Sequence, residues 1–379
     1  MMRIAYCINS YGSGGVEQIT VIKANALAEL EGNNVWIIHT DPPMEGGFHK
    51  PSQKVKLIDL HIGYRDNQHK FPWNIFILIR QLFRHKKALS KALKEIKPDV
   101  VISTGQKEQW IVPHIKGNWI RIRELHMTKG SRLKCAKTKR DHIVSKISEY
   151  LEFEGILNRY DTLVVQTIYE KEADWHNDNR VAVIPNPVRL TDTVVSSLDN
   201  KKILAIGRLE SGKNYSSLIR AFRIVSDRFP DWTLTILGKG TEESLLKKLA
   251  DSLELSHKVY LPGFVPDTEK FLADASIFVH TSMYEALGMV LIEAMSCGLP
   301  VVAYDCPFGP RSIISNGIDG YLVTSGDELL LADRICTLID NAELRKRMGS
   351  AAFDKSKDYR IEVIVAKWMN LFLRLTNHI

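Results

Sequence analysis

Two glutamates, Glu285 and Glu293, lie on either side of a turn that joins an apolar run to a helix-like segment. The run Ile277–Val279 predicts a strand, and the segment that resumes at Gly288 predicts a helix. At such a junction in an open parallel sheet, ligands bind at the carboxyl ends of the strands, and the helix start attracts anions. A rise of ~1.5 Å per helical residue puts the two carboxylates roughly ten Å apart. A diphosphate with a sugar at one end and a ribose at the other has this span, so the pair predicts a nucleotide-sugar site.

An ordinary structural explanation competes with this one. Glu293 can be a solvated helix acid, and Glu285 can be a cap favoured by the helix dipole. The segment around Glu293, Leu291–Met295, is otherwise apolar, and a charge in such a helix is costly unless it has a partner. The setting therefore favours a binding role for both acids.

Two cations, Arg208 and Lys213, follow the apolar run Lys202–Gly207 and precede a helix pattern over Ser216–Phe229. Arginine binds phosphate through a planar fork, and lysine binds it as a point charge. A strand-to-helix turn that carries both therefore suits a diphosphate. The alternative is a solvated turn with no ligand.

The residues around these charges resemble a known family. The segment Glu285–Glu293 resembles the signature E-G-F-G-x-x-x-x-E, although it departs from the signature at Ala286 and Leu287. The segment GRLESGKN, residues 207–214, closely resembles the motif G-R-L-x-x-x-K-G/N. Both motifs are those of family four of the retaining glycosyltransferases, of the bacterial polysaccharide and glycolipid type. The resemblance implies an α/β protein with the GT-B fold, which has two Rossmann-like parallel-sheet domains and an interdomain cleft.

The resemblance also implies roles for four catalytic candidates. Arg208 and Lys213 would neutralise the donor pyrophosphate and stabilise the leaving diphosphate. Glu285 would hold the donor hexose. His126, just after the strand pattern Trp119–Arg123, would contact a sugar hydroxyl, although a lone histidine there is also a common structural turn residue.

Further donor contacts are expected from a Gly-rich loop, a loop after a strand and the helix start. The Gly-rich loop follows the first strand pattern and resembles the family's Gly-Gly loop, but such loops also serve purely as turns. The turn Asp305–Arg311 looks like a variant found in bacterial hexose and hexosamine transferases, and a role as a rigid turn stays open for it. The expected donor contacts are Gly14, Gly15, Val265, Gly288, Met289, Val290 and Glu293, the last of these to the ribose.

The length of 379 residues predicts two domains. Two prolines in the segment Pro185–Val188 cannot continue a strand or helix, so this segment is the expected linker. We expect an acceptor-side Rossmann-like domain over 1–187 and a nucleotide-sugar-binding domain over 188–358. By the resemblance, the amphipathic segment 359–379 forms a C-terminal helix that packs back on the first domain.

The composition excludes several classes of protein. Hydrophobic content of 45% and charged content of 25% are those of a globular protein. No run of 18 apolar residues and no signal peptide is found, and the five scattered cysteines indicate reduced thiols in a cytoplasmic protein. The chain has no D-x-D cluster to carry a divalent metal, so we expect a metal-independent enzyme without a cofactor.

Basic and aromatic residues gather in two segments of the first half, Tyr64–Lys97 and Lys129–Lys146. They predict contact with an anionic membrane surface, which would place the protein in the cytoplasm or peripherally on the inner face of the cell membrane. An amphipathic helix pair with a solvated basic face explains the first segment equally well. Nucleic acid is not expected, because no recognised binding module accompanies the basic residues.

We therefore expect a retaining glycosyltransferase that moves a hexosyl or N-acetylhexosaminyl group from a UDP-sugar to a lipid-linked or oligosaccharide acceptor in surface glycan biosynthesis. A UDP-sugar epimerase of the same architecture is one alternative. A non-catalytic, membrane-surface sugar-binding module is the other, and it would not require the two leaving-group cations.

Overall fold

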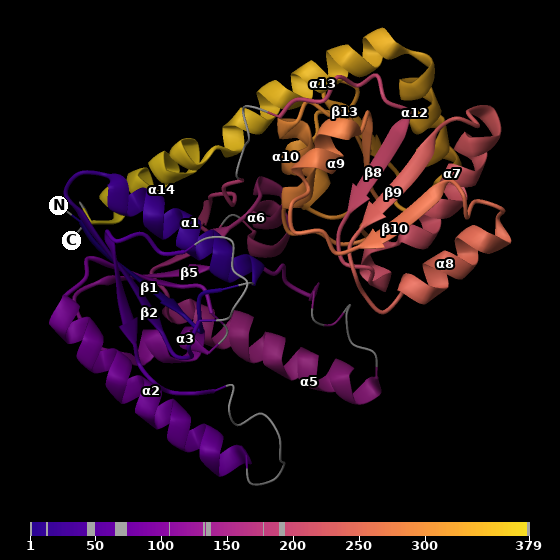
Figure 1. Cartoon of the computed structure of the whole chain (residues 1–379). Helices are drawn as coiled ribbons and strands as arrows, with labels where there is room; N and C mark the ends of the chain where they lie inside the picture. Colours follow the sequence, from indigo (N-terminus) through magenta and orange to yellow (C-terminus); the bar gives the residue numbers. More distant parts are fainter. Residues whose placement is uncertain are drawn as a thin grey trace. The chain divides into compact units, whose positions relative to one another are not determined.

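The computed structural model describes residues 2–12, 14–43, 50–64, 74–105, 107–131, 133, 138–176, 178–188 and 194–376. The chain divides into two compact units (Figure 1). Unit 1 comprises Met1–Gln166, Lys171–Pro187 and Ile361–Ile379, and unit 2 comprises Thr167–Glu170 and Val188–Arg360. Each unit is an α/β layer structure with its own sheet, as expected for two parallel-sheet domains.

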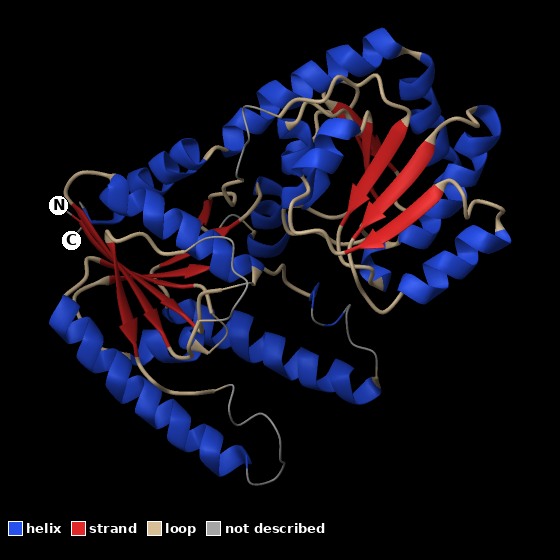
Figure 2. Cartoon of the chain, in the orientation of Figure 1, coloured by secondary structure: helices blue, strands red, loops and turns tan. Residues whose placement is uncertain are grey.

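Unit 1 has a seven-stranded sheet in which every neighbouring pair is parallel (Figure 2). The strand order is β3-β2-β1-β4-β5-β6-β7. Most positions of the strands are buried because helices cover both faces of the sheet. The strands are β1 (Met2–Ile8), β2 (Asn33–His39), β3 (Val55–Asp59), β4 (Val100–Ser103), β5 (Ile120–Glu124), β6 (Thr162–Val165) and β7 (Val181–Val183).

Alternate residues of each strand pack into two separate cores, as the pleat requires. Ile4 and Tyr6 of β1 pack with α1 and α14, whereas Ala5 and Cys7 pack on the opposite face with α2. The C-terminal helix α14 is therefore part of unit 1. The main helices of unit 1 are α1 (Gly15–Glu29), α2 (Asn74–Ile96), α3 (Glu108–Ile111), α5 (Lys139–Tyr150), α6 (Ile168–Trp175, in unit 1 from Lys171) and α14 (Ile361–Thr376).

Unit 2 has a six-stranded parallel sheet in the order β10-β9-β8-β11-β12-β13. Its strands are β8 (Lys202–Ile206), β9 (Thr233–Leu237), β10 (Val259–Gly263), β11 (Ile277–His280), β12 (Val301–Tyr304) and β13 (Gly320–Val323). Its helices are α7 (Tyr215–Arg228), α8 (Glu243–Ser252), α9 (Glu269–Asp274), α10 (Met289–Ser296), α11 (Gly309–Ile313), α12 (Glu328–Asp340) and α13 (Ala342–Ser356). One core lies against α7, α8 and α12, and the other lies against α10.

The strand order of each sheet reverses at one point. In unit 2 the first strand, β8, lies between β9 and the fourth strand, β11. The point between β8 and β11 is therefore the switch point of the sheet, which is where doubly wound sheets bind ligands. The segments that follow these two strands hold Arg208, Lys213 and Glu285.

The basic and aromatic segment of the first half is only partly described. Its described part, residues 74–96, forms the single helix α2, so a helix pair is wrong for these residues. Phe71 and Trp73 lie outside the described residues. Within the described ranges, no helix is both long enough and apolar enough to cross a bilayer. Four of the five cysteines are described, and all four are free and buried.

Candidate functional site

Four loops at the carboxyl ends of the unit 2 strands are tied to one another by backbone hydrogen bonds. They follow β8, β9, β10 and β11, and they contain most of the residues predicted from the motifs. Because each loop is held by its neighbour, the side chains that they carry have defined positions. The bonds run from Gly207 N to Leu237 O (2.9 Å), Leu209 N to Lys239 O (2.9 Å), Gly238 N to Gly263 O (2.9 Å) and Met283 N to Gly212 O (2.9 Å).

Lys213 and Glu285 meet at the point where the sheet order reverses. Lys213 Nζ donates to Glu285 Oε1, and the two side chains are 23% and 16% exposed. The hydroxyl of Thr281 donates to the carbonyl oxygen of Lys213 at 2.9 Å, which fixes the backbone beside the ammonium group. A lysine ammonium has three donors, so Lys213 can hold Glu285 and still donate to a ligand.

Glu285 also lies beside a histidine that the motifs did not predict. Nε2 of His280, at the end of β11, is 3.3 Å from Glu285 Oε1. Burial acts to raise the pKa of Glu285, but His280 and Lys213 outweigh it and hold the pKa well below the ordinary value. Both contacts use Oε1, and no described residue contacts Oε2. The carboxylate is therefore ionised and has one oxygen available to a hydroxyl group.

Arg208 lies on the loop after β8 and differs from Lys213 in its surroundings. Its side chain is exposed, and no carboxylate among the described residues pairs with it. An arginine without an internal partner keeps all five donors for a ligand. The pair thus consists of one held cation and one free cation at the same edge of the sheet.

The loop after Glu285 leads into α10 through Gly288. Gly288 has φ of 92°, a left-handed conformation that glycine adopts without strain, and it caps a helix that begins at Met289 and Val290. Glu293 lies one turn further along this helix, is partly exposed, and has no side-chain partner among the described residues. Burial alone raises its pKa. An acid without a partner at this position is consistent with a binding role.

The turn Asp305–Arg311 packs directly against the Glu285 loop. Gly309 N donates to Glu285 O at 3.2 Å, and a Cβ on Gly309 would lie only 2.3 Å from Leu287 O. This close approach explains the glycine. The turn therefore supports the loop that carries Glu285, and a further role in donor binding stays a prediction. On another side of the site, Val265 is partly buried and follows Gly263, whose φ of 90° turns the chain after β10.

His126 lies in unit 1, just past β5, as the strand pattern predicted. Its Nε2 is 3.6 Å from Glu124 Oε1, and Glu124 accepts a hydrogen bond from Lys23 of α1 in a fully buried ion pair. Burial lowers the pKa of His126 to about 4. Lys23 in turn lies under the ring of Trp368 from α14, 5.1 Å from its centroid. The low pKa favours the uncharged form of His126, and its Nε2 makes no hydrogen bond to a described residue.

Gly14 and Gly15 also lie in unit 1, after β1. Gly14 has extended backbone angles and caps α1, and its carbonyl accepts from Gln18 N at 2.9 Å. A Cβ on Gly15 would have nothing within 4 Å. Gly15 therefore faces open space rather than a packed wall.

The structure brings together Lys213, Glu285 and the start of α10, and it places Arg208 and Val265 on loops tied to them. The motifs missed His280, although a histidine that ends an apolar strand is a signal for such a site. They also missed Lys23, a lysine in an otherwise apolar helix face. Among the residues that the structure describes, no three His, Cys, Asp or Glu side chains are grouped to hold a metal ion.

Comparisons with known proteins give the family that the chain resembles. Residues 192–355 match the family described as "Glycosyl transferases group 1". An uncharacterized glycosyltransferase of Haemophilus influenzae is 28% identical over 387 residues, covering 98% of this chain and 100% of that protein.

Two further proteins are similar along their whole length. An N-acetylgalactosaminyltransferase of Campylobacter jejuni, named for a diphospho-undecaprenol-linked sugar acceptor, is 26% identical over 382 residues and covers 100% of both chains. The solved structure of the pneumococcal O-GlcNAc transferase GtfA, in complex with UDP and GlcNAc, has a TM-score of 0.73 and 15% identity, covering 100% of this chain and 99% of that one. The fold is therefore GT-B.

Proposed function

We propose that this chain, whose residues 192–355 match the group 1 glycosyltransferases, transfers a hexosyl or N-acetylhexosaminyl group from a UDP-sugar to a lipid-linked or oligosaccharide acceptor with retention at the anomeric carbon. That it is a transferase with the GT-B fold is the premise, and the predicted fold, family and enzyme class are confirmed. The donor, the stereochemistry and the acceptor are the proposal.

The observation that carries the proposal is the arrangement of Lys213, Glu285 and the exposed Arg208 at the reversal point of the unit 2 sheet. Transfer breaks the bond between the anomeric carbon and the diphosphate, and negative charge grows on the departing oxygen. Arg208, with its five free donors, and the remaining donors of Lys213 stabilise that charge. The start of α10 after Gly288, at Met289 and Val290, adds N–H groups that attract phosphate.

Glu285, Glu293 and His126 bind hydroxyl groups of the donor. Oε2 of Glu285 accepts from the donor hexose, while Oε1 keeps Lys213 in place. Glu293 accepts from the ribose, and Val265 borders the base. His126, Gly14 and Gly15 contribute from unit 1, where neutral His126 contacts a sugar hydroxyl. With two cations on the diphosphate, the reaction proceeds without a metal ion or other cofactor.

Two observations support a lipid-linked acceptor at an anionic membrane surface. The Campylobacter relative is named for an undecaprenyl-diphosphate-linked acceptor. Two unit 1 helices expose large apolar side chains: Phe76 and Phe83 on α2 are 73% and 71% exposed, and Ile143 on α5 is 60% exposed. Lysines and arginines alternate with these residues on both helices, a composition typical of helices that lie on anionic lipid. We place the protein in the cytoplasm, peripheral to the inner face of the cell membrane.

A donor screen tests the proposal. Purified protein is incubated with UDP-glucose, UDP-galactose, UDP-GlcNAc and UDP-GalNAc, with and without a diphosphate-linked lipid acceptor, and UDP release is measured. We expect acceptor-dependent release with one hexose or hexosamine donor, and an α-linked product from an α-linked donor by proton NMR. Inversion would refute retention. A new UDP-sugar formed without acceptor would indicate an epimerase, and release only from donors of another nucleotide would refute the UDP assignment.

A further inference from the structure

The last strand of the unit 1 sheet, β7, has a free edge. β7 pairs only with β6, in the register Leu163 to Val181 and Val165 to Val183. Leu163 N donates to Arg180 O, and Ile184 N donates to Val165 O at 3.0 Å, so these groups point toward β6. Because successive residues of a strand point their backbone groups to opposite sides, the N–H and C=O of Val183 point away from β6. No backbone or side-chain group among the described residues bonds them.

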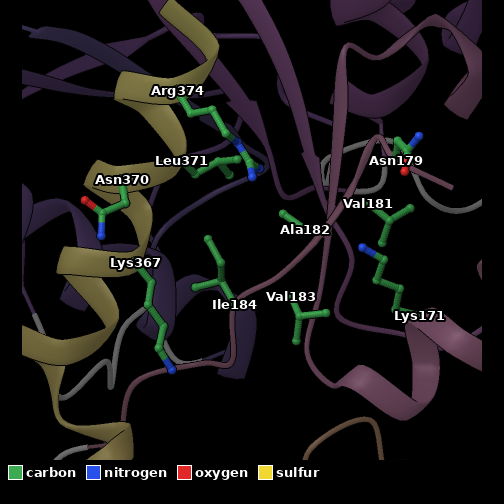
Figure 3. A pocket seen from close by; sticks show the side chains of 10 residues that line it. All are labelled: Lys171, Asn179, Val181, Ala182, Val183, Ile184, Lys367, Asn370, Leu371 and Arg374. Atoms are coloured by element: carbon green, nitrogen blue, oxygen red, sulfur yellow. The ribbon is translucent and has the colours of Figure 1, made fainter. Parts of the chain in front are cut away.

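A groove of about 630 Å³ runs along this free edge (Figure 3). Val181 and Val183 point to one side of the strand, toward Lys171 of α6, and Ala182 and Ile184 point to the other side, toward α14 (Figure 3). The strand therefore forms the centre of the groove, with side chains of α6 on one side and of α14 on the other. The volume lies within the range of ordinary ligand sites.

The rim of the groove is cationic. Lys367 and Arg374, with Asn370 and Leu371 between them, have the i, i+3, i+4, i+7 spacing of one helix face on α14. Lys171 faces them across the strand. Across the described ranges, no acidic side chain lines the groove. Asp178, whose charge interacts with Lys171, makes its ion pair with Arg180. Three positive charges beside an apolar floor attract an anionic partner.

We propose that this groove binds an acidic, extended peptide segment of a partner protein, which adds to β7 as a further strand. The free backbone groups of Val183 supply the hydrogen bonds of strand addition, a role that a lipid phosphate does not use. Alternate side chains of the added strand point toward α14 and toward α6, because strand side chains alternate between faces. Acids at every second position therefore face Lys367 and Arg374. The small apolar residues between them pack on Val181 and Val183, and Lys171 at the rim attracts the acidic segment as a whole. The inference does not depend on the transfer reaction.

The spacing of the cations agrees with this geometry. Lys367 and Arg374 are seven residues apart, which is about 10 Å along a helix. Acids two and four positions apart on a strand are separated by about 7 and 13 Å. The long side chains of lysine and arginine bridge such differences, so a segment with three or four alternating acids satisfies both cations.

The test uses the full-length protein and a fluorescein-labelled heptapeptide that alternates Glu and Val, with binding followed by fluorescence anisotropy. We expect K171Q/K367Q/R374Q to weaken binding at least tenfold. The matched control K248Q/K270Q/R347Q removes the same charge from exposed, unpaired positions of unit 2, and it should change binding less than twofold. Val183→Pro removes the outward N–H without touching the bonds to β6, and it should also weaken binding at least tenfold with an unchanged melting temperature.

Other results overturn the proposal. Equal binding of a peptide N-methylated at alternate main-chain nitrogens would exclude strand addition. A second outcome is that the wild type binds phosphatidylglycerol vesicles but not the peptide, and that K171Q/K367Q/R374Q no longer binds the vesicles. The groove would then be a site for lipid headgroups. If the wild type does not bind the peptide and the groove variant self-associates in analytical ultracentrifugation, the cations serve only to shield the edge strand.

Discussion

Arg208 and Lys213 have the same proposed role but different surroundings, so their alanine variants should fail in different ways. Removing one donor to a transition-state anion costs about 10²-fold in rate, equivalent to about 2.7 kcal/mol. We expect this loss in kcat/KM for both Arg208→Ala and Lys213→Ala. Arg208 is exposed and has no described partner, so its loss should change the free energy of unfolding by less than about 0.5 kcal/mol.

Lys213→Ala should also destabilise the fold. It leaves the Glu285 carboxylate, which is only 16% exposed, without its ammonium partner. Breaking a fully buried pair costs about 3–5 kcal/mol, and because this pair is partly exposed we expect about 2 kcal/mol. For a domain of this size, that lowers the melting temperature by roughly 4–8 °C. The pKa of Glu285 should rise, since burial opposes the charge once Lys213 is gone.

The double variant Lys213→Ala with Glu285→Gln separates the two effects. Without either charge, the desolvation cost disappears, so the melting temperature should recover while the rate stays low. Initial rates of UDP release and differential scanning fluorimetry measure both quantities on the same samples. A near wild-type rate for Arg208→Ala would remove it from the leaving-group role. An equal fall in melting temperature for both single variants would contradict the claim that Lys213 has an internal partner and Arg208 has none.

Further predictions concern the supporting turn, a buried acid, the metal and the membrane. Gly309→Ala should lower the melting temperature by several degrees and the rate about 10²-fold, because its Cβ would displace Leu287 beside the site. Burial raises the pKa of Glu108 to about 7. The stability that protonated Glu108 contributes is therefore full below its unfolded pKa and is lost as the pH rises to 7. Glu108→Gln should remove this pH dependence, which amounts to roughly 3 kcal/mol in the free energy of unfolding. Activity should survive excess EDTA. Replacing both Phe76 and Phe83 by Ser should release the protein from phosphatidylglycerol vesicles with little effect on stability, because both rings are exposed.

Each of these has a contrary outcome. An unaltered rate for Gly309→Ala would show that the turn does not hold the site loop. If the free energy of unfolding changes equally with pH in the wild type and in Glu108→Gln between pH 4.5 and 7, Glu108 is not the group that takes up the proton. Abolition by EDTA with rescue by magnesium or manganese would require a metal in the reaction. Vesicle binding retained without the two phenylalanines would move the membrane contact to another surface.

The sequence predicted the parts of the site but not how they meet. The apolar runs before Arg208 and before Glu285 gave the strands β8 and β11 and put the charges at their carboxyl ends. That Lys213 binds Glu285, 72 residues further on, follows from β8 and β11 being neighbours. Local pattern does not contain strand order, so this pairing and the contact of His280 were not predicted.

Lys23 shows the same limit in unit 1. It lies in an apolar stretch of α1, and the cost of an isolated buried charge signals that a partner exists. The partner is Glu124, 101 residues away, and a lysine gives no indication of which acid it will meet. The strand and helix patterns of the two parallel-sheet domains could be recognised because each depends on composition or periodicity within a short window.

The inclusion of α14 in unit 1 has a consequence for biosynthesis. The first 187 residues leave the ribosome long before α14, yet Trp368 and Phe372 fill the core above α1 and the buried Lys23. Unit 2 is nearly continuous in sequence and has all its strands once residue 323 has emerged. Vectorial synthesis usually lets the amino-terminal domain mature first. In this protein, the packed core of unit 1 can be completed only after α14 has been synthesised.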